Sequence, residues 1–118
     1  DRSARRIRDI VRAKLGVTVG VIVSDTFGRP WRKGLTDVAI GVAGIAGVVD
    51  LRGTEDALGR VMQVTEVAVA DELACAAELV MGKSTGVPVA IIRGADPMWF
   101  RDSSMDEIVR PPSEDLFR

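Results

Sequence analysis

The chain has 118 residues, 47% of them hydrophobic, and its 16 basic and 17 acidic side chains give a formal net charge of −1. This balance does not favour a general attraction to nucleic acid or anionic lipid, and no apolar run approaches the ~20 residues of a membrane-spanning helix, so binding to neither is expected. Cys75 is the single cysteine and there is no histidine, which excludes an internal disulfide, a Ser-His-Asp or Cys-His catalytic site and a Cys/His zinc site within the chain, and fits a reducing cytoplasm.

A helix is expected to open the chain. Apolar side chains recur at helical spacing between Ser3, a suitable N-cap, and about Leu15, and Gly16 is a suitable stop. Residues 17–23 are too apolar and β-branched for a strand with one wet face, so they predict an interior strand. The turn-forming residues at 25–30 predict a loop at the end of that strand.

Residues 36–42 predict a second strand with two unlike faces. The bulky side chains Val38, Ile40 and Val42 share one face, and Asp37, Ala39 and Gly41 share the other. The bulky face is expected to pack on a core. The bare face lets either a ligand or a neighbouring helix approach closely, and both interpretations remain open.

The rest of the chain returns to helical spacing only once. Residues 44–64 predict short strands and turns, 65–81 an amphipathic helix, 87–92 a buried strand, and 94–118 a polar tail on the surface. This order predicts a mixed α/β (α+β) fold with helices packed on a mixed sheet. It is not a complete doubly wound unit, and the chain begins without Met, so residues 1–118 are expected to be part of a larger protein.

The phrase from Gly82 to Thr85 is not a Walker P-loop. That loop needs a further glycine where this chain has Ala77, and it follows a strand and opens a helix, whereas this phrase follows a helix. Two interpretations remain: a helix end with a solvated Lys83, or a phosphate contact of another geometry.

Asp25 and Thr26 are candidate metal ligands at the end of the first predicted strand. A carboxylate beside a hydroxyl is an oxygen pair that suits Mg²⁺ or Mn²⁺, which share their remaining positions with phosphates and water. The alternative is an ordinary turn started by the Asp25 side chain.

Arg29, Trp31 and Arg32 surround a proline just downstream. Two guanidinium groups beside an indole can grip a phosphorylated or aromatic substrate. They can equally form surface ion pairs over an apolar patch.

Several sequence segments, taken together, resemble those of one family. They are the run Val23-Ser24-Asp25-Thr26-Phe27-Gly28-Arg29-Pro30-Trp31-Arg32, then Thr36-Asp37-Val38-Ala39-Ile40-Gly41, Val64-Thr65-Glu66-Val67-Ala68-Val69-Ala70-Asp71-Glu72-Leu73, Met81-Gly82-Lys83 and Gly86-Val87-Pro88-Val89. The chain resembles the later half of the coenzyme F-420-0:L-glutamate ligases, the gamma-glutamyl ligases of deazaflavin cofactor biosynthesis. The likeness extends over nearly the whole chain.

This resemblance implies a GTP-dependent ligase that uses Mg²⁺ or Mn²⁺ and forms a homodimer. Its substrates would be the deazaflavin coenzyme precursor and L-glutamate. The precursor's carboxylate would become an acyl phosphate, and the amine of glutamate would then displace phosphate to form an amide.

The resemblance also assigns roles to residues. Asp25 and Thr26 inherit metal binding, and Asp25 and Arg29 a catalytic role. Substrate binding falls to Trp31, Arg32 and Asp37. GTP binding falls to Met81, Gly82, Lys83, Ser84, Thr85, Gly86, Val87 and Pro88.

Two departures from the family qualify these roles. The family's N-terminal nucleotide-binding stretches and an upstream Asp/Asn metal motif have no counterpart here, so the fragment is expected to be inactive alone. Lys83 stands where some relatives carry a glutamine, and a protonated ammonium cannot ligate metal. The competing hypotheses are a non-catalytic module that dimerises or binds substrate, and a phosphohydrolase that uses Asp25 with a metal.

Overall fold

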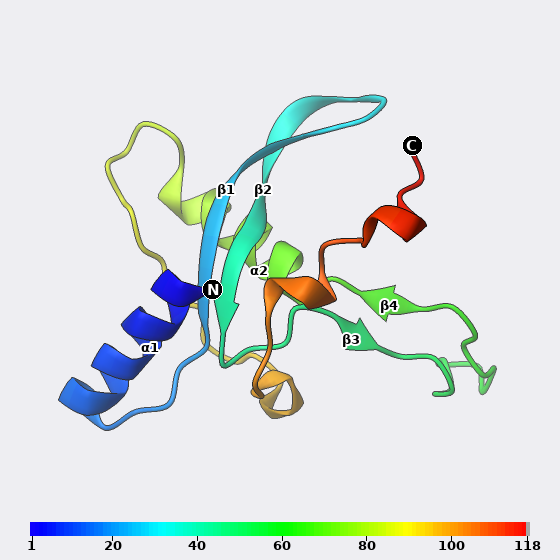
Figure 1. Cartoon of the computed structure of the whole chain (residues 1–118), viewed down its shortest axis with the longest axis horizontal. Helices are drawn as coiled ribbons and strands as arrows, with labels where there is room; N and C mark the ends of the chain where they lie inside the picture. Colours follow the sequence, from blue (N-terminus) through cyan, green and yellow to red (C-terminus); the bar gives the residue numbers. More distant parts are fainter. Residues whose placement is uncertain (118) are drawn as a thin grey trace.

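The structure, a computed structural model, describes residues 1–117 and confirms a mixed α/β fold (Figure 1). Its elements are α1 (Arg2–Leu15), β1 (Val21–Arg29), β2 (Arg32–Ala43), β3 (Val49–Asp50), β4 (Glu66–Val67) and α2 (Val69–Met81), then the short 3₁₀ turns η1 (Pro97–Trp99), η2 (Met105–Glu107) and η3 (Pro112–Glu114). β1 pairs with β2 and β3 with β4, both antiparallel, so the described residues contain no parallel pair of the expected mixed sheet.

The first helix begins two residues earlier than expected. Asp1 occupies the N-cap position, so the prediction of Ser3 as the cap is wrong. The Asp1 carboxylate instead accepts hydrogen bonds from the amides of Val42 and Met105, each 3.1 Å long, and thereby joins α1 to β2 and η2. The predicted stop is confirmed, because Gly16 has a left-handed φ of 66° and donates its amide to the carbonyl of Arg12.

A long β-hairpin replaces the expected loop at 25–30. β1 continues to Arg29 because β2 pairs with it along its whole length, up to the pair Arg29–Arg32. Cross-strand pairing therefore prevails over the turn-forming residues, and the turn itself is confined to Pro30 and Trp31. In Figure 1 this hairpin extends well beyond both helices.

A bulge in β2 breaks the alternation that the sequence predicts. Val23 pairs with Gly41 and Ser24 with Ala39, so Ile40 has no partner, and it is 52% exposed. The prediction that Ile40 shares a core face with Val42 is therefore wrong, because the inserted residue shifts the two strand segments by one position. Ala39 and Val42 both enter the core, at 4% and 0% exposure.

Side chains of α2 cover the outer edge of β2. Asp71 accepts the amide of Ala39 at 2.9 Å, and the thiol of Cys75 donates to the carbonyl of Asp37 at 3.1 Å. α2 begins at Val69 rather than at 65, since Glu66 and Val67 pair with β3 instead. The core lies between these elements and contains Ala39, Val42 and Ala70, with Ile22, Met105 and Ile108 packed against it.

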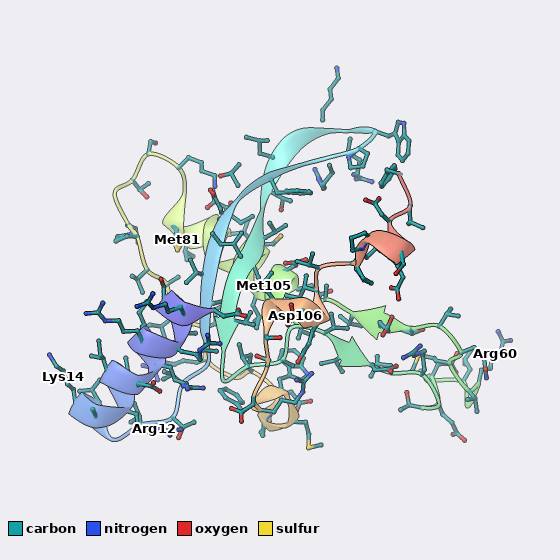
Figure 2. The ribbon with its side chains drawn as sticks, in the orientation of Figure 1. Arg12, Lys14, Arg60, Met81, Met105 and Asp106 are labelled. Carbon is teal, nitrogen blue, oxygen red and sulfur yellow. The ribbon has the colours of Figure 1, made fainter. Side chains whose placement is uncertain are left out.

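Two predictions for the last third of the chain are wrong. Residues 87–92 form no strand, because nothing in the described residues pairs with them. The tail does not lie on the surface alone. Met105 of η2 and Ile108, the C-cap of η2, pack against the core. Figure 2 shows Met105 close to the middle of the molecule. Arg118, the last residue of the predicted tail, lies outside the described residues.

The fold is open. Its accessible surface is 8848 Å² and its radius of gyration 15.7 Å, against about 6,200 Å² and about 13.5 Å for a compact monomer of this size. Apolar side chains such as Leu79 and Val80 of α2 are 87% and 70% exposed. Because its sheet has two strands, β1 is an edge strand here rather than the interior strand expected from its composition.

No helix within residues 1–117 combines the length and apolar character needed to cross a membrane.

Candidate functional site

The ammonium group of Lys83 is the centre of a polar cluster between the hairpin and the end of α2. Its Nζ lies 2.6 Å from Oδ1 of Asp37, 2.8 Å from Oγ1 of Thr26 and 3.3 Å from Oε1 of Glu78. The ammonium donates hydrogen bonds to Asp37 and Thr26, and its contact with Glu78 is an ion pair. The cluster joins β1, β2, α2 and the segment that follows α2.

Asp37 is the buried member of this cluster. It is 3% exposed, and its second carboxylate oxygen accepts a hydrogen bond of 3.3 Å from the hydroxyl of Ser24. The thiol of Cys75, which donates to the backbone carbonyl of Asp37, also lies 2.9 Å from the hydroxyl of Thr36. A buried carboxylate with partners on each oxygen is a fixed negative charge that can hold Lys83 in one place.

Local structure explains how these side chains converge. Thr26 and Asp37 are directly opposite in the β1–β2 ladder, so they share one face of the hairpin. Glu78 lies in the last turn of α2. Gly82, with a positive φ of 62°, ends the helix and redirects the chain so that Lys83 returns to the hairpin.

The electrostatic effect on Lys83 follows from these contacts. The pKa of Lys83 is raised above its ordinary value, mainly by the hydrogen bond to Asp37, with a smaller contribution from Glu78 and against a desolvation effect that lowers it. Lys83 therefore remains a cation throughout the neutral range.

Asp25 and Thr26 do not face the same side of the hairpin. They are consecutive residues in a regularly paired part of β1, so their side chains point to opposite faces. Asp25 is exposed, and its Oδ1 accepts the Thr26 amide at 2.7 Å within the strand, so the turn interpretation of Asp25 is wrong. No group of three or more acidic, cysteine or histidine side chains among residues 1–117 is arranged to hold a metal ion.

The three candidate substrate-binding residues lie in two separate parts of the structure. Trp31 and Arg32 lie at the hairpin tip with Arg29, which donates to the carbonyl of Lys33 at 3.4 Å. Trp31 is 90% exposed, and its ring centroid lies 5.8 Å from that of Phe117. Within the described residues no hydrogen bond or ion pair joins this tip to the Lys83 cluster. Asp37, the third candidate, lies inside that cluster.

The segment from Gly82 to Pro88 is a solvent-exposed loop. The hydroxyl of Thr85 donates to the carbonyl of Met81, which closes the loop over the end of α2. Figure 2 shows Met81 at the point where the helix passes into this loop. Of the eight residues assigned to GTP, only Lys83 contacts the hairpin through a hydrogen bond that the described residues show.

Three residues that contact the cluster receive no role in the sequence-based prediction: Ser24, Cys75 and Glu78. The strand spacing of Ser24 and Thr26, two residues apart, was a usable signal for Ser24. Glu78 and Cys75 carried no such signal, because they meet the hairpin only through the packing of α2.

Comparison with known proteins gives the family. Residues 1–94 match the F420-0:gamma-glutamyl ligase family, and the chain belongs to it. A coenzyme F420:L-glutamate ligase of Methanococcus maripaludis strain C7 is 48% identical over 119 aligned positions, which cover 100% of this chain and 48% of that protein. The protein of the same name from Methanocaldococcus jannaschii is 48% identical, with 100% and 47% covered. The chain thus spans about half the length of the curated relatives it matches.

Proposed function

We propose that this chain is part of a ligase that joins L-glutamate through an amide bond to the deazaflavin precursor of coenzyme F420. The observation that carries this proposal is the 48% identity over the whole chain to proteins named coenzyme F420:L-glutamate ligase. GTP as the co-substrate, a Mg²⁺ or Mn²⁺ ion, a homodimer and a cytoplasmic location belong to the same proposal.

The proposed reaction has two steps. A carboxylate oxygen of the precursor attacks the γ-phosphorus of GTP, the bond to the leaving GDP oxygen breaks, and an acyl phosphate forms. The amine of glutamate then attacks the acyl carbon, phosphate leaves with its oxygen, and the amine loses a proton. Most of the catalysis in such transfers is positioning and neutralisation of charge.

The proposal includes a role for each candidate residue of this chain. The Lys83 ammonium and the loop from Gly82 to Pro88 bind the GTP phosphates. The guanidinium groups of Arg29 and Arg32 bind anionic groups of the precursor, and Trp31 packs on its ring system. Asp37 acts on substrates only through Lys83, because it is buried beneath that side chain.

A divalent cation fits this chain in part. Asp25 offers an exposed carboxylate, whereas the Thr26 hydroxyl faces the other side and binds Lys83. One carboxylate is a sparse site, but Mg²⁺ is often held by one or two carboxylates together with phosphates and water. An ion bound at Asp25 would offset negative charge on the transferred phosphoryl group.

The test is an assay of the complete protein that carries this chain, with GTP, L-glutamate, the precursor and Mn²⁺. We expect an amide product by mass spectrometry and phosphate release that depends on glutamate. Asp25→Ala should lower the rate at least about 100-fold, as expected for the loss of a charge-neutralising group in phosphoryl transfer. Asp106→Ala is the matched control, since the side chain of this exposed aspartate has one hydrogen bond in the described residues, from Ser104.

Two other outcomes would decide for the competing functions. Phosphate release at the same rate without glutamate would identify a phosphohydrolase. GTP binding without turnover in the complete protein would identify a non-catalytic binding module. Light scattering after size-exclusion chromatography tests the proposed homodimer separately.

A further inference from the structure

Three oxygen partners already surround the Lys83 ammonium. Thr26 and Asp37 accept hydrogen bonds from it at 2.8 and 2.6 Å, and Glu78 forms an ion pair with it at 3.3 Å. A phosphate oxygen that binds Lys83 therefore competes with these partners. The partner that leaves most readily is the one that is held least strongly.

Asp37 is not that partner. Its carboxylate is 4% exposed and makes the shortest of the three contacts, and its other oxygen is bound by Ser24. Freed of Lys83, it would be a buried charge without a counter-ion, which is a costly state. Thr26 is neutral, so its departure would leave the charge around Lys83 unchanged.

Glu78 has the opposite properties. Its contact with Nζ is the longest of the three, and its side chain is 20% exposed, against 4% for that of Asp37. Glu78 also lies in the last turn of α2, where the helix carbonyls make a negative charge unfavourable. With Asp37 and Glu78 against one ammonium, the cluster carries a net charge of −1, and an incoming anion meets this excess charge.

We propose that Glu78 is an internal substitute for an anionic ligand, and that a polyphosphate displaces it from Lys83 on binding. The chemical class of the ligand is the phosphate chain of a nucleoside triphosphate. This inference rests on the proposed function, because it assumes that Lys83 contacts phosphate. Glu78 is here a positioning residue. It holds the Lys83 ammonium at the site, and it lowers the affinity of Lys83 for anions that bind less strongly than a polyphosphate.

The proposal predicts an unusual gain of affinity from the loss of a charged side chain. Glu78→Gln removes one negative charge but keeps the shape of the side chain, so the cluster becomes neutral. We expect sodium triphosphate, titrated by calorimetry into the complete protein, to bind about tenfold more tightly to this variant. Glu72→Gln, an exposed acidic position on the same helix, should leave the affinity unchanged.

Lys83 must carry the effect if the inference is right. In Lys83→Gln, triphosphate should bind more weakly, and adding Glu78→Gln to it should no longer tighten binding. Thermal melting followed by circular dichroism checks that each variant folds. If Lys83→Gln is too unstable, the double variant Asp37→Asn/Lys83→Met leaves no buried charge and takes its place.

The outcomes separate this inference from the proposed function. If Lys83→Gln weakens triphosphate binding but Glu78→Gln behaves like Glu72→Gln, Glu78 is not a substitute ligand, and the phosphate role of Lys83 stands. If Lys83→Gln binds triphosphate as well as the unchanged protein does, both the phosphate role of Lys83 and the inference are wrong. Ligase activity with GTP, measured in parallel, tests the enzyme proposal independently of both.

Discussion

Thr26 and Asp37 face each other across the β1–β2 ladder, and the same Lys83 ammonium binds both of them. The pairing fixes the two oxygens at the spacing of directly opposed residues, so the hairpin presents a ready-made acceptor pair to a cation. Lys83 reaches this pair from 46 and 57 residues further along the chain. The contact therefore ties the end of α2 to the hairpin.

The ion pair between Lys83 and Asp37 is predicted to contribute to the free energy of unfolding. Lys83→Met leaves the Asp37 carboxylate buried without a counter-ion and should lower the free energy of unfolding, by less than for a fully buried pair because Lys83 is half exposed. Adding Asp37→Asn removes the stranded charge, so the double variant should be more stable than Lys83→Met alone. Chemical denaturation of the complete protein measures both values.

Lys33→Met is the control for that experiment, since Lys33 is an exposed lysine at the hairpin tip. It should change the unfolding free energy by less than about 0.5 kcal/mol. A double variant less stable than Lys83→Met would contradict the role given to the ion pair.

Glu107 is predicted to make stability depend on pH. Its carboxylate accepts from Arg101 at 2.6 and 3.0 Å and from the amide of Gly47 at 3.1 Å. These bonds, chiefly those from Arg101, hold the pKa of Glu107 below its ordinary value of 4.5. Because the pKa is lower in the folded state, the stabilisation is complete above 4.5 and is lost as the pH falls through the folded-state pKa.

The measurement is the difference in melting temperature between the unchanged protein and Glu107→Gln across the acid range. At neutral pH the variant should be less stable by about 1–2 kcal/mol, the value of a few hydrogen bonds to a charged group. The difference should narrow as the pH falls below 4.5. The exposed Glu114→Gln should show no such trend, and a difference that is constant with pH would disprove the assignment.

Trp31 is predicted to be strained. Its φ of 58° is positive, and a proline precedes it in the turn, an arrangement typical of a type II turn that favours glycine at this position. Trp31→Gly should therefore be more stable than Trp31→Ala, which keeps the strain, by about 1 kcal/mol. Melting of the two variants measures this difference, and equal stabilities would show that the turn is not strained.

The same two variants test the proposed binding role of the indole ring. Both lack the ring, so both should weaken binding of the deazaflavin precursor to a similar extent. Binding and stability would then change independently of each other. A precursor affinity equal to that of the unchanged protein would remove Trp31 from the substrate site.

Features set by neighbouring residues were predictable from the sequence. The body of α1 and α2 follows from apolar residues at helical spacing, and the left-handed Gly16 follows from its place after the last helical turn. These signals need no knowledge of distant residues. They gave the fold class and both helices.

Features set by distant contacts were not predictable in the same way. The bulge at Ile40 is invisible in a sequence that alternates regularly, because it accompanies the capture of the neighbouring Ala39 amide by Asp71 of α2. The extension of β1 through turn-forming residues depends likewise on pairing with β2. Of the site, the phrases around Asp37 and Lys83 were found, but their direct contact and its third partner Glu78 required the packing of α2.

The opposite orientations of Asp25 and Thr26 have a consequence for any nucleotide that uses both sides of the hairpin. A phosphate chain bound to Lys83, with its metal ion on Asp25, has to cross the outer edge of β1, since β2 closes the other side. The Thr26 amide points to that edge, where the Asp25 carboxylate now accepts its hydrogen bond. A cation that binds this carboxylate and moves it away would free the Thr26 amide at the point where the phosphate chain crosses β1. Metal binding at Asp25 would thereby provide a main-chain hydrogen-bond donor for the phosphate.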